Sequence, residues 1–259
     1  MTPVALTVAG SDPSGGAGIQ ADLKTFHQFR VYGEAVLTLI TVQNTQTVSR
    51  VDLLDPELVR QQIEAVLGDI PPDAAKTGAL GSAAIIEAVA HAIGGTKLVV
   101  DPVMISKHGA PLMEPDAVDA LRRTLFAKAL LITPNLHEAA ALTGRPVETE
   151  EQMVSAARYI LELGPQAVLI KGGHRIGNQA SDVLVTNDTL DWFTSERIDT
   201  PHTHGTGCTY SAAITALLAT GTPLRDAVAQ AKAFITQAIK TNPALGRGQG
   251  PVNHFSATP

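Results

Sequence analysis

The chain has 259 residues, of which 44% are hydrophobic and 17% are charged, and its formal net charge is −6. This length and apolar content fit one large α/β domain, residues 1–259, better than two small domains. The acidic balance and the absence of any run rich in Lys and Arg argue against binding to nucleic acid or to a membrane surface. We therefore expect the partner to be a small molecule.

The cysteine content and the amino-terminal residues bear on the compartment. Cys208 is the one cysteine, so the chain cannot form an intramolecular disulfide or a zinc site built on thiolates. Residues 1–9 lack the basic and long apolar regions of a signal peptide. No apolar stretch approaches the roughly 20 residues that cross a membrane. The expectation is a cytoplasmic protein.

The first half of the chain alternates between short apolar runs, typical of buried strands, and segments with helical periodicity. A glycine-rich loop at 10–18 separates the first strand from the first helix. The pattern predicts strands at 4–9, 35–42, 74–77, 97–101 and 129–133, a further apolar run at 48–54, and helices at 19–29, from Pro56 onward, at 82–93 and at 115–126.

The second half continues the alternation and shows no repeat or linker that would divide the chain. It predicts helices at 136–143, 150–163, 206–220 and 223–240, a strand at 167–171, and a hairpin of runs 182–186 and 190–194 turned at Asn187 and Asp188. The tail from Asn242 is rich in Gly and Pro, and we expect it to lie over the surface. Together the elements predict a mostly parallel sheet with helices on both faces and a small antiparallel edge hairpin.

The junction at 205–209 joins a Gly-Thr-Gly turn to the start of an alanine-rich helix. Such a turn directs several unpaired backbone N–H groups and the positive end of the helix dipole at one point, which suits a phosphate. Cys208 would lie in the first helical turn, where the same field lowers the pKa of a thiol, and it could assist proton transfer. Alternatively, the turn only ends a loop and Cys208 packs as a small apolar residue.

Polar residues also follow the first two strands. Glycines in the loop 10–18 would let the backbone wrap around a small ligand, and Asp12 or Asp22 could accept hydrogen bonds from it. A tight connection explains the loop equally, whereas a dinucleotide-binding fingerprint is disfavoured because no acidic residue closes a second strand at the required distance. After the second strand, the amides of Gln43 and Asn44 could read a heteroaromatic edge, or simply cap the strand.

Charged residues follow three later strands. Asp101 and Glu138 offer hard oxygen ligands for Mg²⁺ beside polyphosphate oxygens, although either could instead cap a helix. Lys171, followed by Gly172, could bind a nucleotide phosphate as a point charge, although a lysine before a turn is an ordinary finding. Because the carboxyl ends of parallel strands share one edge of a sheet, we expect these groups to meet there. The combination is suited to phosphoryl transfer.

Taken together, the motifs resemble those of the ribokinase-like superfamily, and within it the hydroxymethylpyrimidine/phosphomethylpyrimidine kinases of thiamine biosynthesis. The resemblance is carried by AGSDPSGGAGIQAD at 9–22, QNT at 43–45, KTG at 76–78, DPVM at 101–104, TPN at 133–135, KGGH at 171–174 and THGTGCT at 203–209. It implies a three-layer α/β/α sandwich, a homodimer, and phosphorylation by ATP with Mg²⁺. The substrate implied is 4-amino-5-hydroxymethyl-2-methylpyrimidine, phosphorylated first at its hydroxymethyl oxygen and then to the diphosphate at the same site.

The resemblance also implies roles for particular residues of this sequence. Gln43 would hydrogen-bond the aminopyrimidine edge, and the substrate would also meet Asp22, Gly10 and Asp12. The catalytic anion hole would comprise Gly205, Thr206, Gly207 and Cys208. Glu138 and Asp101 would serve the Mg²⁺ region, and the nucleotide would be bound by Lys171, Asn135 and Gly172.

Other functions remain open from the sequence. Most sugar kinases of the superfamily have an aspartate base at the position of Cys208, whereas the pyrimidine kinases, like this chain, have a cysteine there. Some similar bacterial enzymes with that cysteine phosphorylate pyridoxal or pyridoxine, so a vitamin B6 kinase is the nearest alternative. His108 departs from the small polar residue expected there, which leaves that loop's conformation open. Remoter alternatives are a cysteine hydrolase using His202 or His204, and a non-catalytic nucleotide or vitamin sensor.

Overall fold

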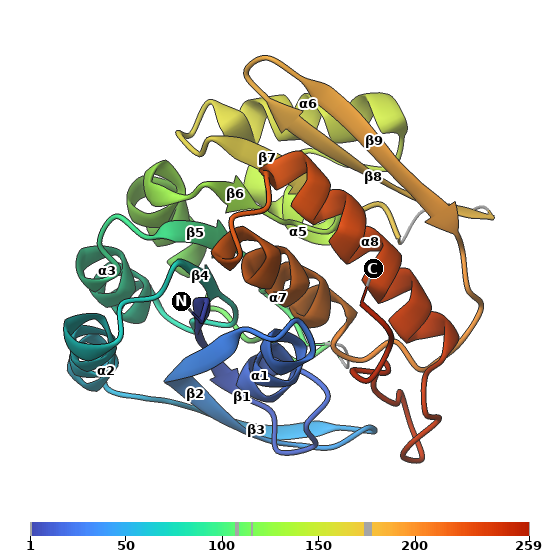
Figure 1. The fold of residues 1–259 in the computed structure, drawn as a ribbon. Helices are drawn as coiled ribbons and strands as arrows, with labels where there is room; N and C mark the ends of the chain where they lie inside the picture. The colour runs from blue at the N-terminus through green and yellow to red at the C-terminus, as the bar shows by residue number, and fades with distance from the viewer. Residues whose placement is uncertain (1, 107–108, 115, 174–177, 259) are drawn as a thin grey trace.

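The computed structural model describes residues 2–106, 109–114, 116–173 and 178–258. Within these residues, nine strands form one sheet in the order β3-β2-β1-β4-β5-β6-β7-β8-β9 (Figure 1). Their bounds are β1 Val4–Ser11, β2 Tyr32–Gln43, β3 Val48–Leu53, β4 Ala74–Thr77, β5 Lys97–Val100, β6 Leu131–Ile132, β7 Ala167–Ile170, β8 Gln179–Thr186 and β9 Leu190–Glu196.

The centre of the sheet is parallel and both of its edges are antiparallel. Strands β2, β1, β4, β5, β6 and β7 pair in parallel, while β8 and β9 form the predicted hairpin on β7. At the other edge β3 runs antiparallel to β2, with Leu39 opposite Leu53. The sequence predicts this strand as an apolar run but not its direction. The carboxyl ends of the parallel strands therefore lie together, as expected.

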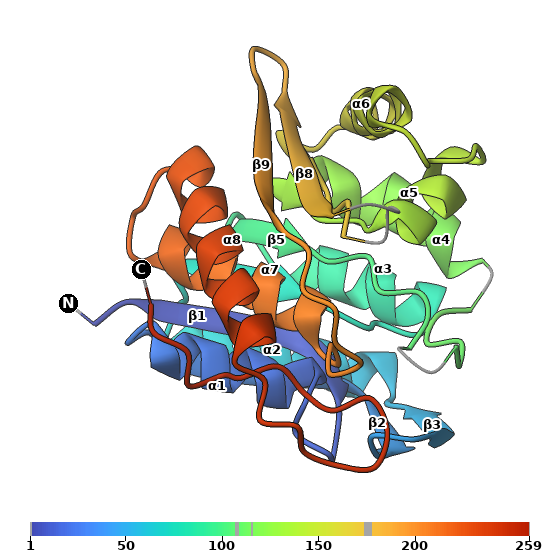
Figure 2. The ribbon, with the colours of Figure 1, turned by 90° about the vertical axis from the view of Figure 1, so that its right-hand side faces the viewer.

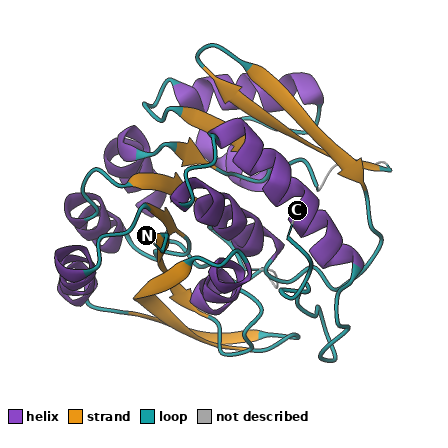
Figure 3. Ribbon diagram, in the orientation of Figure 1, coloured by secondary structure: helices purple, strands orange, loops and turns teal. Residues whose placement is uncertain are grey.

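Helices cover both faces of the sheet, which confirms the predicted three-layer sandwich (Figures 2 and 3). One face packs against α2 Pro56–Asp69, α3 Ala83–Ala92, α4 Ala117–Ala120, α5 Leu136–Thr143 and α6 Glu150–Leu161. The other packs against α1 Gly18–Gln28, α7 Thr206–Ala219 and α8 Leu224–Lys240. Helix α7 is buried along most of its length, because it lies between the sheet and helices α1 and α8. Its small alanine side chains permit this close approach.

Local hydrogen bonds explain why three helices begin where the sequence predicts. Asp55 accepts the amide hydrogen of Glu57, and Pro56 needs no partner in the first turn of α2. Asn135 and Glu138 form a reciprocal capping box at the start of α5. Thr149 and Gln152 do the same at the start of α6.

The single helix predicted at 115–126 is wrong in detail. The structure has a short α4, a π-type turn Leu121–Leu125 and a 3₁₀ turn Phe126–Lys128; Pro115 lies outside the described residues. The Thr124 hydroxyl donates to the Ala120 carbonyl at 2.7 Å within this irregular stretch. The following strand is correspondingly shorter than the predicted 129–133.

The expectation that the tail lies over the surface is wrong for its middle part. Val252, His254 and Ser256 are buried, and Val252 joins the apolar core beside α7 and α8. We call residues 246–256 the C-terminal strap. Figure 2 shows the red end of the chain passing near β2 and β3 and then running beside α1 to the C-terminus. The strap becomes buried because it packs against the helices on this face: the Asn253 amide donates to the Ala238 carbonyl of α8, and His254 lies within hydrogen-bond distance of Thr209 in α7.

Candidate active site

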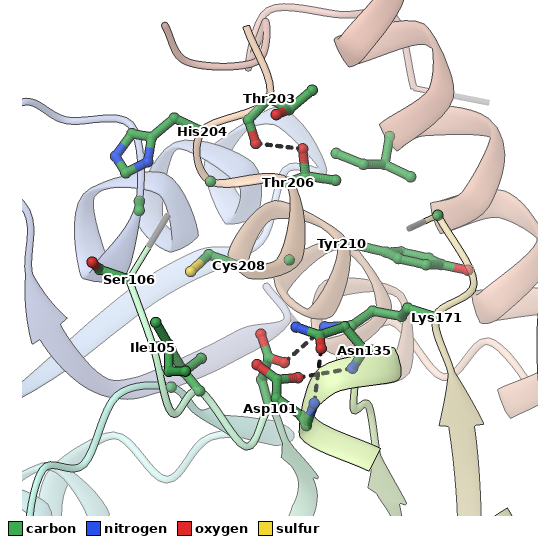
Figure 4. Close-up of a pocket in the computed structure, with 18 of the residues that line it drawn as sticks. Asp101, Ile105, Ser106, Asn135, Lys171, Thr203, His204, Thr206, Cys208 and Tyr210 are labelled. Atoms are coloured by element: carbon green, nitrogen blue, oxygen red, sulfur yellow. Dashed lines mark hydrogen bonds and ion pairs between the residues drawn. The ribbon is translucent and has the colours of Figure 1, made fainter. Parts of the chain in front are cut away.

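A cavity of about 710 Å³ opens at the carboxyl ends of the parallel strands (Figure 4). It is lined by the loops after β1, β2, β5 and β7 and by the turn that precedes α7. Of the predicted site residues, the lining contains Gly10, Asp12, Gln43, Asp101, Asn135, Glu138, Lys171, Gly205, Thr206, Gly207 and Cys208. Asp22 and Gly172 are not part of it.

The turn before α7 presents backbone donors to this cavity. Gly205 adopts a left-handed conformation with φ 78°, and Thr206 is fixed through its hydroxyl, which donates to the Thr203 carbonyl at 2.8 Å. The amide N–H groups of Gly205, Gly207 and Cys208 have no hydrogen-bond partner among the described residues. A Cβ at position 205 would come within 1.7 Å of the Gly16 carbonyl oxygen, so this turn requires glycine. The free amides and the helix dipole together suit an anion.

The Cys208 sulfur faces the cavity, on the side where Ile105 and Ser106 lie (Figure 4). Burial raises the pKa of this thiol to about 12, although the positive charge of Lys76 opposes the effect. The sequence-based expectation of a lowered pKa is therefore wrong. The reason is that the thiol is desolvated and lies near the carboxylates of Asp22 and Asp101, both of which belong to other elements.

A buried ion pair lies beside the helix start. The Lys171 ammonium donates to Asp101 Oδ1 at 2.9 Å, and Thr133 and Ser211 donate to the two oxygens of the same carboxylate. Burial alone would raise the pKa of Asp101, but the charges of Lys171 and Lys76 lower it below its ordinary value. A Cβ on Gly207 would lie 3.4 Å from Lys171 Nζ. The lysine charge is therefore adjacent to the open amides.

Glu138 combines a structural contact with a place in the cavity. Its Oε2 accepts the Asn135 amide hydrogen at 2.8 Å, and the Asn135 side chain accepts the Glu138 amide hydrogen at 2.9 Å. Burial raises the pKa of Glu138 to about 7, and Asp101 adds to the rise while Lys171 opposes it. Glu138 therefore caps the start of α5 and also lines the cavity, so both interpretations of this residue from the sequence fit the structure.

The donor set fits a magnesium ion held together with substrate phosphates. Among the described residues, no cluster of three or more His, Cys, Asp or Glu side chains could hold a metal alone. Mg²⁺, however, usually binds through one or two carboxylates plus phosphate oxygens and water. Asp101 and Glu138 both line the cavity and supply those carboxylates.

Asp12 organises the glycine loop from inside. Its Oδ1 accepts hydrogen bonds from the Ser14 amide and hydroxyl, and its Oδ2 accepts from the Gly16 and Ala17 amides and from His204 Nε2 at 2.7 Å. Burial would raise the pKa of Asp12, but the hydrogen bonds from His204 and Ser14 outweigh burial and lower it. Its predicted contact with the substrate stays a prediction, and the structure shows how the carboxylate shapes the loop.

Asp22 lies beneath the lining and belongs to a second buried ion pair that the sequence reasoning missed. Lys76 donates to Asp22 Oδ2 at 2.7 Å, both side chains are fully buried, and Thr7 donates to the same oxygen. Burial lowers the pKa of Lys76, but the nearby negative groups, of which Asp22 contributes most, together outweigh burial and raise that pKa. A lysine within the short apolar strand β4 was an available signal, because a buried charge requires a partner. Contact between Asp22 and substrate stays a prediction.

A third pair supports the lysine loop after β7. The Gly172 amide donates to Asp182 Oδ1 at 2.9 Å, and Lys232 of α8 donates to Asp182 Oδ2 at 2.7 Å. This contact occupies the Gly172 amide, and its predicted contact with the nucleotide stays a prediction. Asp182 and Lys232 themselves line the cavity. Nothing in the sequence pairs a residue of β8 with one of α8.

Gln43 ends β2 at the cavity wall, and the structure records no hydrogen bond of its side-chain amide with a described residue. The two histidines considered for a hydrolase are engaged elsewhere: His204 pairs with Asp12, and His202 Nδ1 accepts the Gly250 amide hydrogen at 3.1 Å. His174 and His108 lie outside the described residues. In the described part of the chain no helix could span a bilayer.

A three-layer fold with an anion-binding helix start, a lysine and two carboxylates at one sheet edge is the arrangement of a small-molecule kinase. Comparison with known proteins agrees. The sequence pattern of the phosphomethylpyrimidine kinase family matches residues 12–253. The chain is 46% identical to a hydroxymethylpyrimidine/phosphomethylpyrimidine kinase of Staphylococcus aureus strain Mu50, over 98% of this chain and 94% of that one. This chain belongs to the phosphomethylpyrimidine kinase family and is an enzyme, a kinase.

Two further similar proteins differ from this chain in length or in the activity that their names give. The thiamine biosynthesis bifunctional protein ThiED of Geobacter sulfurreducens is 49% identical over 97% of this chain, which spans 52% of that longer protein. An ADP complex of Bacillus subtilis pyridoxal kinase superposes with a TM-score of 0.91 at 43% identity, covering 99% of this chain and 98% of that one. The predicted family and the ribokinase-like fold are thus confirmed, and the pyridoxal kinase is a close structural neighbour.

Proposed function

We propose that the chain phosphorylates 4-amino-5-hydroxymethyl-2-methylpyrimidine with ATP, and then phosphorylates the monophosphate to the diphosphate. The observation that carries this proposal is the turn before α7. Three of its amide groups, which have no partner in the part of the chain that the structure describes, face the same cavity as the Cys208 sulfur and the Lys171 ammonium. The family match supports the pyrimidine as the substrate.

We expect the two ends of the cavity to receive different ligands. Gln43, Gly10 and Leu39 line the half formed after β1 and β2, which would receive the pyrimidine. An amide offers one donor group and one acceptor to an aminopyrimidine edge, which has both. Lys232 and Ile235 of α8 line the opposite half, which would receive the nucleotide. The open amides lie between, where a phosphoryl group would pass from one ligand to the other.

Cys208 would handle the hydrogen of the acceptor alcohol. In a loose transition state the alcohol loses its proton late; the thiolate form of Cys208 would accept it and become the thiol, as the alcohol oxygen bonds to the phosphoryl group and ADP leaves. With a pKa raised to about 12, the sulfur is mostly a thiol near neutral pH, and we expect turnover to rise with pH. Lys171 would neutralise phosphate charge and the open amides would hold the developing anion.

Mg²⁺ and ATP complete the proposal. Asp101 and Glu138 would hold the ion, which when bound neutralises phosphate charge and orients the polyphosphate. Asn135 fixes Glu138 through the capping box, and Lys171 fixes Asp101 through the ion pair. ADP in the Bacillus subtilis pyridoxal kinase supports use of an adenine nucleotide.

Phosphorylation of pyridoxal is the second candidate, and the close structural match to a pyridoxal kinase favours it. The deciding experiment measures kcat/KM for the pyrimidine alcohol and for pyridoxal, each with Mg-ATP, and follows mono- and diphosphate products by mass spectrometry. The proposal expects the higher kcat/KM for the pyrimidine and a diphosphate product. Phosphorylation of pyridoxal alone would replace it, and phosphorylation of neither compound would favour the sensor.

The proposal includes the setting in which the enzyme works. Residues 1–259 would act as one ribokinase-like kinase domain, in the cytoplasm where ATP is available, and as a homodimer by its likeness to the superfamily. Sedimentation of the purified protein at micromolar concentration tests the dimer, since a single species of the monomer mass would contradict it.

A further inference from the structure

A contact between two distant loops stands apart from the roles described so far. The imidazole of His204 and the carboxylate of Asp12 meet at 2.7 Å, and the two side chains are only 5% and 2% exposed. Asp12 belongs to the glycine loop after β1, and His204 directly precedes the Gly205 turn. Figure 4 shows His204 at the turn that leads to Cys208. The pair therefore joins the substrate loop to the anion-binding turn.

Both partners of this pair are themselves held in place. Asp12 gathers the amides of Gly16 and Ala17 around the same oxygen that meets His204. The backbone of His204 is fixed by the C-terminal strap, since its amide donates to Gly250 O at 3.0 Å and its carbonyl accepts from the Val252 amide at 3.3 Å. A movement of either side chain would thus be transmitted to the loop behind it.

The two loops are also in steric contact at their glycines. A Cβ on Gly16 would lie 2.5 Å from the His204 ring, and a Cβ on Gly205 would lie 1.7 Å from the Gly16 carbonyl oxygen. The backbones approach as closely as glycine permits. The hydrogen bond between His204 and Asp12 links the side chains of the two loops where their backbones are closest, so it helps to fix their separation.

We propose that His204 and Asp12 are a positioning pair, which sets the open amides of Gly205, Gly207 and Cys208 at the correct distance from a substrate bound in the glycine loop. The proposal rests on the proposed kinase function and adds residues that act through the anion hole without touching the reacting atoms. Its consequence is that loss of the pair misplaces the phosphoryl-binding amides relative to the acceptor oxygen. A displacement of about 1 Å can cost roughly 10²-fold in rate.

The test compares single and double variants of the full-length protein with Mg-ATP and the pyrimidine alcohol. His204→Leu and Asp12→Asn should each lower kcat about 10- to 100-fold while KM for ATP changes less than about twofold. His204→Gln, whose amide nitrogen reaches the place of Nε2, should restore most of the rate. The double variant should be no slower than the slower single variant, because both changes break one contact.

A second readout does not depend on turnover. Cys208 is the one cysteine, so the rate of its alkylation by iodoacetamide reports on the start of α7. That rate should rise in His204→Leu and return towards the wild-type value in His204→Gln. His91→Leu, a change at an exposed histidine of α3, is the matched control and should alter neither readout. If His204→Leu does not fold, His204→Asn breaks the same contact with a polar side chain, and the same losses are expected.

Two results would contradict the positioning role of His204 and Asp12. These are a folded His204→Leu or His204→Asn protein with wild-type kcat and wild-type alkylation, or single effects that multiply in the double variant. Failure of the proposed function looks different. The wild-type enzyme would then leave the pyrimidine unphosphorylated, while the alkylation rates would still decide whether His204 positions the helix start.

Discussion

At the scale of single residues, the site depends on charges that are buried in pairs. Lys171 with Asp101 and Lys76 with Asp22 place two cations close to Cys208 without leaving an uncompensated charge. Residue type and position after a strand were enough to predict Asp101 and Lys171 as members of the cavity. The protonation state of the thiol could not be predicted, because it depends on desolvation and on carboxylates that only the fold brings near it.

The raised pKa of Cys208 gives a direct prediction. The thiolate is the nucleophile in alkylation, so in the ligand-free protein the rate with iodoacetamide should still be rising at about pH 10, because the pKa is raised to about 12. Free cysteine measured in parallel should level off near its ordinary pKa of about 8.5. A plateau of the protein rate below about pH 9 would show that the helix field dominates over burial.

Gln43 allows a test of substrate recognition. Gln43→Leu keeps the size of the side chain but leaves the donor and acceptor of the pyrimidine edge unpaired, at a cost of roughly 1–3 kcal/mol in binding free energy. Titration calorimetry should show weaker binding of the pyrimidine and unchanged binding of Mg-ATP. Equal pyrimidine affinity in both proteins would remove Gln43 from recognition.

At the scale of elements, the strap joins parts of the site that are far apart in sequence. The Gln249 amide donates to Thr45 O at 2.7 Å, next to Gln43 and the end of β2. His254 Nε2 lies 3.1 Å from the Thr209 hydroxyl of α7. Most helices and strands were predictable, because periodicity and caps are local signals. The strap was not, since its burial comes from contacts with helices and loops that are distant in sequence, and its glycines resemble those of any exposed tail.

A glycine in the strap tests its role. Gly248→Ala would place a Cβ 2.1 Å from the backbone oxygen of Thr45, which cannot move as a flexible side chain could. We expect a loss of about 1–3 kcal/mol in the free energy of unfolding, and weaker pyrimidine binding because Gln43 is two residues from Thr45. Urea unfolding and calorimetry measure the two effects.

Gly68→Ala in helix α2 is the matched control. No atom lies within 4 Å of a Cβ there, and the residue is helical, so this change should stabilise the protein by up to about 1 kcal/mol. If Gly248→Ala is as harmless as Gly68→Ala, the strap does not hold the end of β2 in place.

At the scale of the whole molecule, stability should depend on pH through Glu34 in β2. Burial, and then the nearby charge of Asp69, raise the pKa of Glu34 to about 7. Its Oε2 is buried without a hydrogen-bond partner among the described residues. The folded state therefore binds this proton more tightly than the unfolded state does. The stability that protonated Glu34 contributes is complete below the ordinary pKa of a glutamate and is lost as the pH rises through about 7.

Glu34→Gln should remove this dependence. The variant should be more stable than the wild type at about pH 8, and the difference should shrink as the pH falls towards about 4.5, as urea unfolding at several pH values would show. Glu87→Gln, at an exposed site on α3, serves as the control and should leave the profile unchanged. A stability difference that is constant with pH would contradict the assignment to Glu34.

Phosphoryl transfer at the turn before α7, with Cys208 as the proton acceptor, is the central proposal for this cavity. The most direct measurement is single-turnover transfer from Mg-ATP to the pyrimidine alcohol in the wild type and in Cys208→Ala, with pyrimidine affinity measured by calorimetry on both. We predict a rate about 10²–10⁴-fold lower in the variant with nearly unchanged affinity, because a positioned proton acceptor contributes that much. Wild-type transfer in Cys208→Ala, or loss of pyrimidine binding without loss of rate, would contradict the claim.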